Sequence, residues 1–233
     1  MLFKFLSKLL KKNNKKVVYT AITGDYDELF TPVYINDNWD YVCFTDNNNL
    51  KSDFWQIRKM KDLKLDKVKK ARNYKILPHL YLQEYQYSLW IDGNFRIIGD
   101  IDEYIRRFSK DKSMLCFVHP ERKCIYDEAE VCIKLNKDSD EIIKKQIKEY
   151  QSENYPENRG LIASGILFRK HNDPIIINLM NKWWDELKLH SFRDQLSFDY
   201  VCWKKSFDYD KCDLCCWETE YFEWNSHNKK ESI

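Results

Sequence analysis

An acidic residue and an amide follow the apolar run from Ser88 to Ile91, where Asp92 and Asn94 stand on either side of a glycine. In open α/β sheets ligands bind beyond the carboxyl ends of the strands, so a carboxylate placed there can hold a metal or a ribose hydroxyl. Mn²⁺ or Mg²⁺ bound there would neutralise the charge that develops on a diphosphate leaving group. The pattern predicts a metal site at Asp92 and Asn94 for a nucleotide sugar, with His227 of the polar tail as candidate third ligand. D-G-N is also the composition of a plain turn after a strand.

Two basic residues, Arg72 and Lys75, lie three positions apart in a segment predicted to be helical from Asp66 to about Leu77. This spacing places them on adjacent parts of one helix surface. On a helix that precedes the strand ending at Asp92, they are suited to clamp phosphates or a sugar carboxylate. The alternative is that they form surface ion pairs.

An aspartate and a glutamine, Asp194 and Gln195, stand where a helix is predicted to begin. A purely structural Asp there would stabilise the helix dipole by about 0.3–1 kcal/mol. The functional alternative is that the pair faces a reacting anomeric carbon, where it orients an acceptor hydroxyl or stabilises oxocarbenium character. The sequence alone favours neither.

A histidine and an arginine, His119 and Arg122, follow another predicted strand and so belong to the same rim. We interpret them as candidate contacts for an acceptor. A histidine beside a proline at the end of a strand also has a purely structural interpretation.

Strands that alternate with helices predict an α/β fold with a mainly parallel sheet flanked by helices, in one domain. Beyond residue 204 the chain is aromatic and irregular, and this tail is able to wrap back over the site. The predicted strands are 16–23, 41–44, 55–58, 87–91, 114–118 and 160–168, and the predicted helices are 66–77, 101–108, 129–150 with a break near 136–139, 174–189 and 194–203.

The charge is distributed unevenly along the 233 residues, whose formal net charge is +2. The leader, residues 1–16, carries six lysines and no acid, so the remaining chain is net acidic, which argues against a general nucleic-acid binder. Leucines and phenylalanines alternate with lysines in the leader, as in a short amphipathic helix on an anionic membrane surface. We therefore predict a cytoplasmic protein with peripheral contact to the inner face of the membrane. The alternative is a packed or solvated N-terminus.

The eight cysteines do not indicate a disulfide scaffold, because Cys43, Cys116 and Cys202 lie in apolar runs typical of core positions. The cluster Cys212–Cys216 contains one C-x-x-C pair, half of a zinc site, without a second pair at ligand spacing.

The chain resembles the glycosyltransferase-like family of bacteria and plants that includes the plant pectin and mucilage galacturonosyltransferases. The resemblance extends over residues 17–203 and rests on seven ordered blocks: VYTAITGDYDEL, DYVCFTDN, ARNYKILPH, SLWIDGN, HPERKCIYDEA, GLIASGILFRKHND and SFRDQLSFDYV. It implies a GT-A-type nucleotide-diphospho-sugar fold, metal dependence and a UDP-sugar donor. It also implies that the uridine is cradled by Thr20, Ala21, Thr23, Thr45 and Asp46, and that Arg72 reaches the donor.

More remotely, the chain is similar to glycogenin-like retaining enzymes, in which an aspartate-glutamine pair lies beside the donor sugar. Asp194 and Gln195 match that pair, and this likeness favours retention. If the reaction instead inverts configuration, Asp194 is the first candidate base.

We therefore expect a short leader and one GT-A-like domain over residues 17–233. The expected activity is transfer of a hexosyl or uronosyl group from a UDP-sugar to a glycan or lipid-linked saccharide. Asn94 stands where the D-x-D motif of many glycosyltransferases has its second acid. This difference favours the alternative of a non-catalytic glycan- or nucleotide-sugar-binding protein on a degenerate transferase fold. A metal-dependent hydrolase would need more His and acidic ligands than the five scattered histidines supply.

Overall fold

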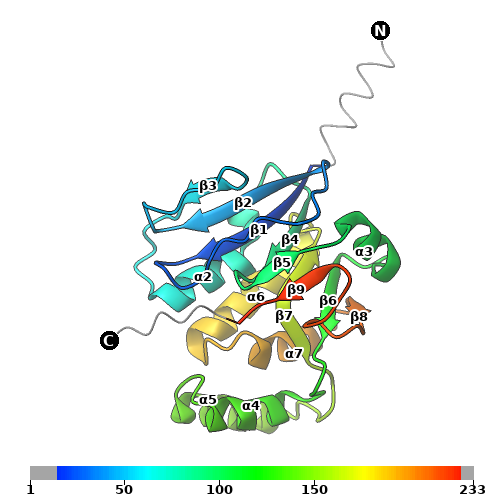
Figure 1. Cartoon of the computed structure of the whole chain (residues 1–233). Coiled ribbons are helices and arrows are strands. Elements are labelled where there is room, and N and C mark those ends of the chain that lie inside the picture. Colours follow the sequence, from blue (N-terminus) through cyan, green and yellow to red (C-terminus); the bar gives the residue numbers. More distant parts are fainter. Residues whose placement is uncertain (1–14, 227–233) are drawn as a thin grey trace.

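The computed structural model describes residues 15–226 and contains one α/β domain built on a seven-stranded sheet (Figure 1). The strand order in that sheet is β3-β2-β1-β4-β7-β6-β8, and a second sheet pairs β5 with β9. The strands are β1 (Lys16–Ile22), β2 (Trp39–Thr45), β3 (Gln56–Lys59), β4 (Tyr87–Ile91), β5 (Phe95–Ile97), β6 (Met114–Val118), β7 (Ile162–Arg169), β8 (Asp210–Cys212) and β9 (Phe222–Trp224).

Strand direction brings most of the predicted polar strand ends to one edge of the sheet. Strand β1 is parallel to β2 and β4, β2 is parallel to β3, and β6 is parallel to β8. Strand β7 is antiparallel to both of its neighbours, β4 and β6. The carboxyl ends of β1, β2, β4 and β6 therefore meet the start of β7 at one edge, which we call the carboxyl edge. The prediction of a mainly parallel sheet is confirmed, with β7 as the reversed strand.

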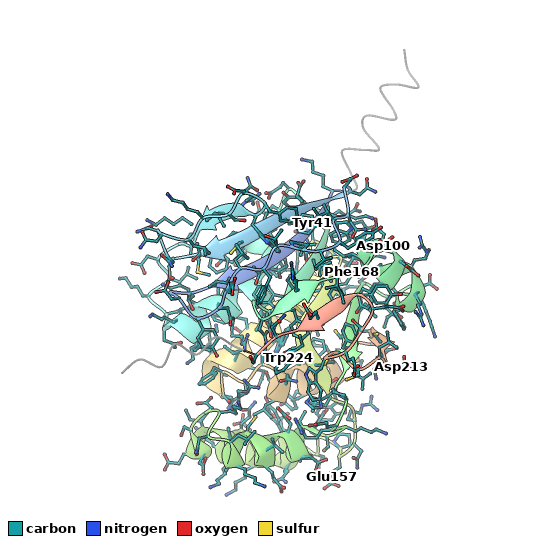
Figure 2. All side chains as sticks on the ribbon, viewed as in Figure 1. Tyr41, Asp100, Glu157, Phe168, Asp213 and Trp224 are labelled. Atoms are coloured by element: carbon teal, nitrogen blue, oxygen red, sulfur yellow. The ribbon has the colours of Figure 1, made fainter. Side chains whose placement is uncertain are left out.

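Helices cover both faces of the sheet, and side chains fill the space between the layers (Figures 1 and 2). Helices α2, α6 and α7 contribute to one apolar cluster with the sheet, whereas α3 and the β5-β9 sheet contribute to the other. Helices α4 and α5 pack together, and α4 also contacts α7. The helices are α2 (Lys67–Ile76), α3 (Ile101–Phe108), α4 (Ile125–Lys134), α5 (Asp140–Ser152), α6 (Pro174–Leu189) and α7 (Gln195–Lys204), with a 3-10 turn η1 at Pro78–Leu80.

The alternation of side chains along β1 builds the two clusters. Val17 and Tyr19 face the cluster that contains Trp183, whereas Val18 and Ile22 face the opposite one. Because successive strand residues point to opposite faces, a strand buried on both sides must be apolar throughout. This accounts for the continuous apolar runs of the sequence.

The predicted strands and helices all occur, with ends shifted by a few residues, and the break expected near residues 136–139 separates α4 from α5. Strands β5, β8 and β9 were not predicted. All eight cysteines are free thiols, and all except Cys215 are buried, including Cys43, Cys116 and Cys202, which were predicted to be core residues. Residues 1–14 of the predicted leader, and His227, lie outside the described residues. Within residues 15–226 no helix is both long and apolar enough to cross a membrane.

Candidate active site

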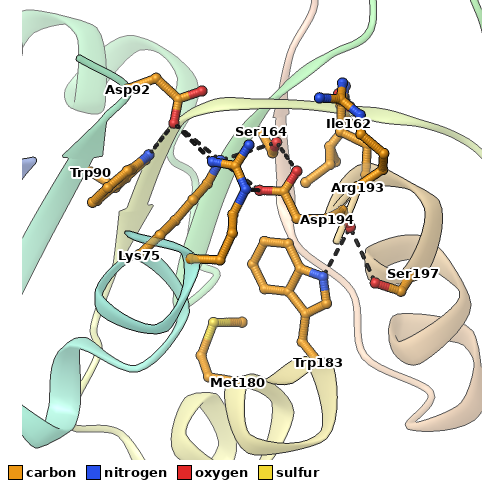
Figure 3. Close-up of polar contacts among 12 residues, drawn as sticks. Lys75, Trp90, Asp92, Ile162, Ser164, Met180, Trp183, Arg193, Asp194 and Ser197 are labelled. Atoms are coloured by element: carbon orange, nitrogen blue, oxygen red, sulfur yellow. Dashed lines mark hydrogen bonds and ion pairs between the residues drawn. The ribbon is translucent and has the colours of Figure 1, made fainter. Parts of the chain in front are cut away.

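Helix α2 supplies two basic side chains to the carboxyl edge. The helix begins after Asp66, whose carboxylate accepts a hydrogen bond from the backbone N–H of Lys69 (2.8 Å). In the last turn, the carbonyl of Lys75 accepts hydrogen bonds from the hydroxyl of Tyr19 (2.8 Å) and the guanidinium of Arg169 (2.8 Å). These bonds fix the backbone of Lys75, whose fully buried side chain extends toward the end of β4 (Figure 3).

The carboxylate of Asp194 meets these basic groups inside the protein. Its Oδ2 lies 2.7 Å from Lys75 Nζ and 3.5 Å from Arg72 Nε, and its Oδ1 accepts a hydrogen bond of 3.1 Å from the hydroxyl of Ser164. Asp194 holds the N-cap position of α7, yet its side chain makes no capping hydrogen bond. The carboxylate therefore contacts α2 and β7 and makes no capping hydrogen bond to the start of its own helix.

Asp92 reaches the same basic groups from the end of β4. Its Oδ1 accepts hydrogen bonds from Trp90 Nε1 (2.7 Å) and Lys75 Nζ (3.2 Å), and it lies 3.8 Å from an Arg72 guanidinium nitrogen. Its backbone N–H donates to the carbonyl of Gly165 on β7 (2.8 Å), which fixes the turn after β4. The contacts that Figure 3 draws to Asp92 all go to one carboxylate oxygen.

Burial excludes the alternative of surface ion pairs for the two basic residues. The side chain of Lys75 is 0% exposed and that of Arg72 is 19% exposed. Burial alone would raise the pKa of Asp194, but the Arg72 and Lys75 charges and the hydrogen bond from Lys75 outweigh it and hold this pKa well below its usual range. Burial lowers the pKa of Arg72, but the charges of Asp194 and Asp92 outweigh it and raise this pKa. Asp194 and Arg72 are consequently both charged at neutral pH.

Gln195 lies beside this charged cluster. Its side-chain amide donates a hydrogen bond of 2.8 Å to the carbonyl of Ile162, the first residue of β7, and its oxygen lies 3.5 Å from the guanidinium of Arg193. The amide is thus held against the carboxyl edge, one residue from Asp194.

The residues predicted to bind uridine line the ends of the two neighbouring strands β1 and β2. Ile22 and Thr45 are paired in the strand register, and Thr20, Thr23 and Thr45 are buried. Asp46 accepts hydrogen bonds from the backbone N–H of Gly24 (2.8 Å) and from Lys70 Nζ (3.0 Å). Ala21 follows Thr20 on β1 and pairs with Phe44 on β2. The structure therefore brings this set to the edge that carries Asp92.

The predicted metal ligands differ in their surroundings. Asp92 keeps one carboxylate oxygen outside the contacts described above, and Asn94 donates through its amide nitrogen to the carbonyl of Asn225 (3.1 Å), a bond that does not use its amide oxygen. One carboxylate and one amide oxygen fit Mn²⁺ or Mg²⁺ when the phosphates of a substrate supply further ligands. Within residues 15–226 no three His, Cys, Asp or Glu side chains gather as a metal site of their own. The C-x-x-C pair at Cys212 and Cys215 therefore belongs to no such group among the described residues.

His119 and Arg122 reach the carboxyl edge but form a separate group. The His119 ring accepts hydrogen bonds at Nδ1 from the backbone N–H groups of Glu121 and Arg122 (both 3.2 Å). Arg122 Nε donates to the buried carboxylate of Glu128 (2.6 Å). Burial, followed by the Arg122 charge, lowers the pKa of His119. The ring is thus held neutral at the end of β6.

Three further residues lie near the cluster and were not predicted from the sequence. Ser164 donates to Asp194 and also accepts a hydrogen bond of 3.2 Å from Lys75 Nζ, and Trp90 binds Asp92. Asp27 packs on Gly93 so closely that a Cβ there would lie 2.8 Å from its carboxylate. A serine within an apolar strand was the available signal for Ser164. Trp90 and Asp27 were not predicted as site residues.

The fold and this site define a class, namely a Rossmann-like α/β domain with a buried cluster of two cations and two carboxylates at the carboxyl edge of its sheet. The sequence model of the family described as TOD1/MUCI70, glycosyltransferase-like domain, matches residues 6–223, so the chain belongs to this family. Membership supports a glycosyltransferase-type function. The match extends past residue 203, where the sequence blocks ended, and includes β8 and part of β9. A comparison with curated proteins gave no significant match.

Proposed function

We propose that the protein is a metal-dependent GT-A-type glycosyltransferase. In this proposal it transfers a sugar, with retention of configuration, from a UDP-sugar to a glycan or lipid-linked saccharide. The observation that supports it best is the cluster of Arg72, Lys75, Asp92 and Asp194 at the carboxyl edge. In open α/β sheets this edge is the usual place for nucleotide ligands.

The charges of the cluster indicate how the donor would bind. Two basic and two acidic groups lie within ion-pair distance of one another and nearly cancel, so a diphosphate needs further positive charge. Asp92 and Asn94 would hold a divalent cation that supplies this charge and stabilises the leaving diphosphate. Arg72 would contact the donor phosphates, with the uridine along Thr20, Thr23 and Thr45.

The electrostatics of Asp194 favour retention in this proposal. A carboxylate whose pKa is held far below its usual range by Lys75 and Arg72 is a weak base. It is better suited to stabilise positive charge on the anomeric carbon, with Gln195 beside it. In the retaining reaction the bond from the anomeric carbon to the phosphate oxygen breaks and a bond to the acceptor oxygen forms. The acceptor's proton passes to the departing phosphate on the same face.

The test is turnover of the full chain with a panel of UDP-sugars and saccharide acceptors, in buffers with Mn²⁺, with Mg²⁺ or with chelator. We expect UDP release that requires both donor and acceptor, and a product whose anomeric configuration, read by NMR, equals that of the donor. Binding of a nucleotide sugar without turnover of any donor would instead assign the protein to the non-catalytic binders. The opposite anomer in the product would refute retention.

A further inference from the structure

Two tryptophans in the C-terminal segment are exposed. The side chain of Trp217 is 40% exposed and that of Trp224 is 44% exposed, whereas the other six tryptophans of the chain are buried or half-buried. Exposed indoles are unusual on a soluble surface and mark a contact site when they occur together. Both residues follow the cysteine cluster, in a segment for which the catalytic proposal has no use.

A tight turn and one antiparallel bridge bring the chain segments that carry the two tryptophans together. The hydroxyl of Thr219 accepts hydrogen bonds from the backbone N–H groups of Tyr221 (3.2 Å) and Phe222 (2.8 Å), and an antiparallel bridge pairs Glu218 with Glu223. Trp217 precedes the first residue of this bridge and Trp224 follows the second, so the bridge brings both tryptophans to the same end of the turn. We call the segment 217–224 the tryptophan hairpin.

The hairpin is held by backbone hydrogen bonds to the turn of Asp92, Gly93 and Asn94 in the candidate active site. Trp224, which Figure 2 labels on β9, pairs with Phe95 of β5, and the backbone N–H of Asn225 donates to the carbonyl of Asn94 (2.8 Å). Farther along, Gly99 touches the hairpin so closely that a Cβ there would lie 2.3 Å from the carbonyl of Glu220. The position of Trp224 beside the end of β4 is therefore fixed.

The other strand of the hairpin lies at the end of β6. The Trp217 ring is 6.0 Å from the ring of His119, centroid to centroid, in an edge-to-face arrangement. In the sheet, β7 alone separates β6 from β4, so the hairpin spans the part of the carboxyl edge next to Asp92 and Asp194. An extended ligand on the two indoles would pass this site.

The chemistry of the hairpin favours an uncharged saccharide. Indole faces pack on the C–H face of sugar rings without requiring charge. The hairpin carries three acidic residues and no basic one, and the nearby Arg122 is already paired with Glu121 and Glu128. Glu220 is paired with Arg107, and the remaining acidic side chains of the hairpin would repel a polyanion. We propose that Trp217 and Trp224 form a stacking platform for a neutral glycan acceptor, an inference that rests on the proposed transferase function.

The test is calorimetric titration of the full chain with neutral oligosaccharides of glucose, galactose, mannose and N-acetylglucosamine, and with oligogalacturonides of matching length. We expect a neutral oligosaccharide to bind, and Trp217→Ala and Trp224→Ala each to weaken that binding by at least about tenfold. Trp217→Phe, which keeps a ring, should lose less. Ile175→Ala is the matched control, because Ile175 is 64% exposed at the start of α6, beyond the opposite edge of the sheet.

UDP titration and thermal melting of the same variants separate this inference from the proposed function. Unchanged UDP affinity and melting temperature in the tryptophan variants, with weakened glycan binding, support the platform. The platform is overturned if no neutral oligosaccharide binds the wild type, if both alanine variants bind it normally, or if oligogalacturonides bind as tightly. Failure of the wild type to bind UDP or any UDP-sugar would refute the transferase proposal and leave a glycan-binding platform in place.

Discussion

Lys75 and Asp194 form an ion pair with a separation of 2.7 Å in which both side chains are buried, at 0% and 2% exposure. The hydroxyl of Ser164 bridges the two, since it accepts from the ammonium group and donates to the carboxylate. Removing two charges from water costs several kcal/mol each, and an ion pair offsets this cost only when its remaining polar atoms are also bonded. An arrangement this costly for stability is typical of a functional site.

We predict that Asp194→Asn destabilises the protein by about 3–5 kcal/mol, because it leaves the buried ammonium group of Lys75 without its main partner. An aspartate that interacted only with the dipole of its helix would contribute about 0.3–1 kcal/mol to the free energy of unfolding. Urea denaturation at pH 7 measures the difference. Asp185→Asn is the control, since Asp185 pairs with the half-exposed Lys182 and Lys188 on α6 and should cost at most about 1 kcal/mol. Equal losses in the two variants would contradict the prediction.

The pH dependence of the free energy of unfolding should also reflect the ion pair of Lys75 and Asp194. The folded-state pKa of Asp194 is lowered, because the Arg72 and Lys75 charges outweigh burial, so its stabilisation is complete above the ordinary carboxyl pKa of about 3.9. The stability difference between wild type and Asp194→Asn should be constant from about pH 8 to 5 and shrink as the pH falls below about 4. Urea midpoints across this range measure it.

Asp199 provides a control for which the stability contribution should change with pH in the opposite direction. Burial raises the pKa of Asp199 in spite of hydrogen bonds from Tyr209 and the backbone of Ile162. A raised folded-state pKa gives a contribution that is present below the ordinary carboxyl pKa and lost as the pH rises through the folded value. Asp199→Asn should therefore be least harmful near neutral pH. The same trend in both variants would refute the assignment of the shifts.

We predict that Arg72→Lys lowers sugar transfer by about a hundredfold although it keeps the charge. The guanidinium of Arg72 faces Asp194 through Nε at 3.5 Å and Asp92 through a terminal nitrogen at 3.8 Å, and one ammonium group cannot replace both contacts. Turnover of a UDP-sugar measures the effect. Arg106→Lys, on the exposed surface of α3, should keep normal turnover. Normal turnover of Arg72→Lys would remove Arg72 from the proposed mechanism.

The metal proposal predicts that wild-type protein binds UDP at least about tenfold more tightly with Mn²⁺ or Mg²⁺ than with chelator. Asp92→Ala should abolish this difference, because it removes the predicted carboxylate ligand. Calorimetric titration of UDP under each condition measures both results, and a circular-dichroism spectrum checks the fold. Asp185→Asn again serves as the unaffected control. Equal UDP affinity of the wild type with metal and with chelator would exclude the cation from donor binding.

The sequence was sufficient for the sheet-forming runs, the helix that carries Arg72 and Lys75, and the strand that ends at Asp92. Each of these depends on local patterns, namely apolar periodicity and the polar residues that terminate a strand. The sequence was not sufficient for β5, β8 and β9, three-residue strands that form only because a partner strand is already in place. A segment that short carries too little periodicity to be predicted.

The amino-acid sequence by itself determined which side chains are able to do chemistry, because residue type and strand or helix ends are local properties. Only the tertiary structure decided how they combine. It reversed β7, which brought Ser164 between Lys75 and Asp194, and it turned Asp194 away from its own helix end. The physical reason is burial, since the charge state and partner of a side chain depend on the residues that exclude water around it, and these come from strands and helices far apart in the chain.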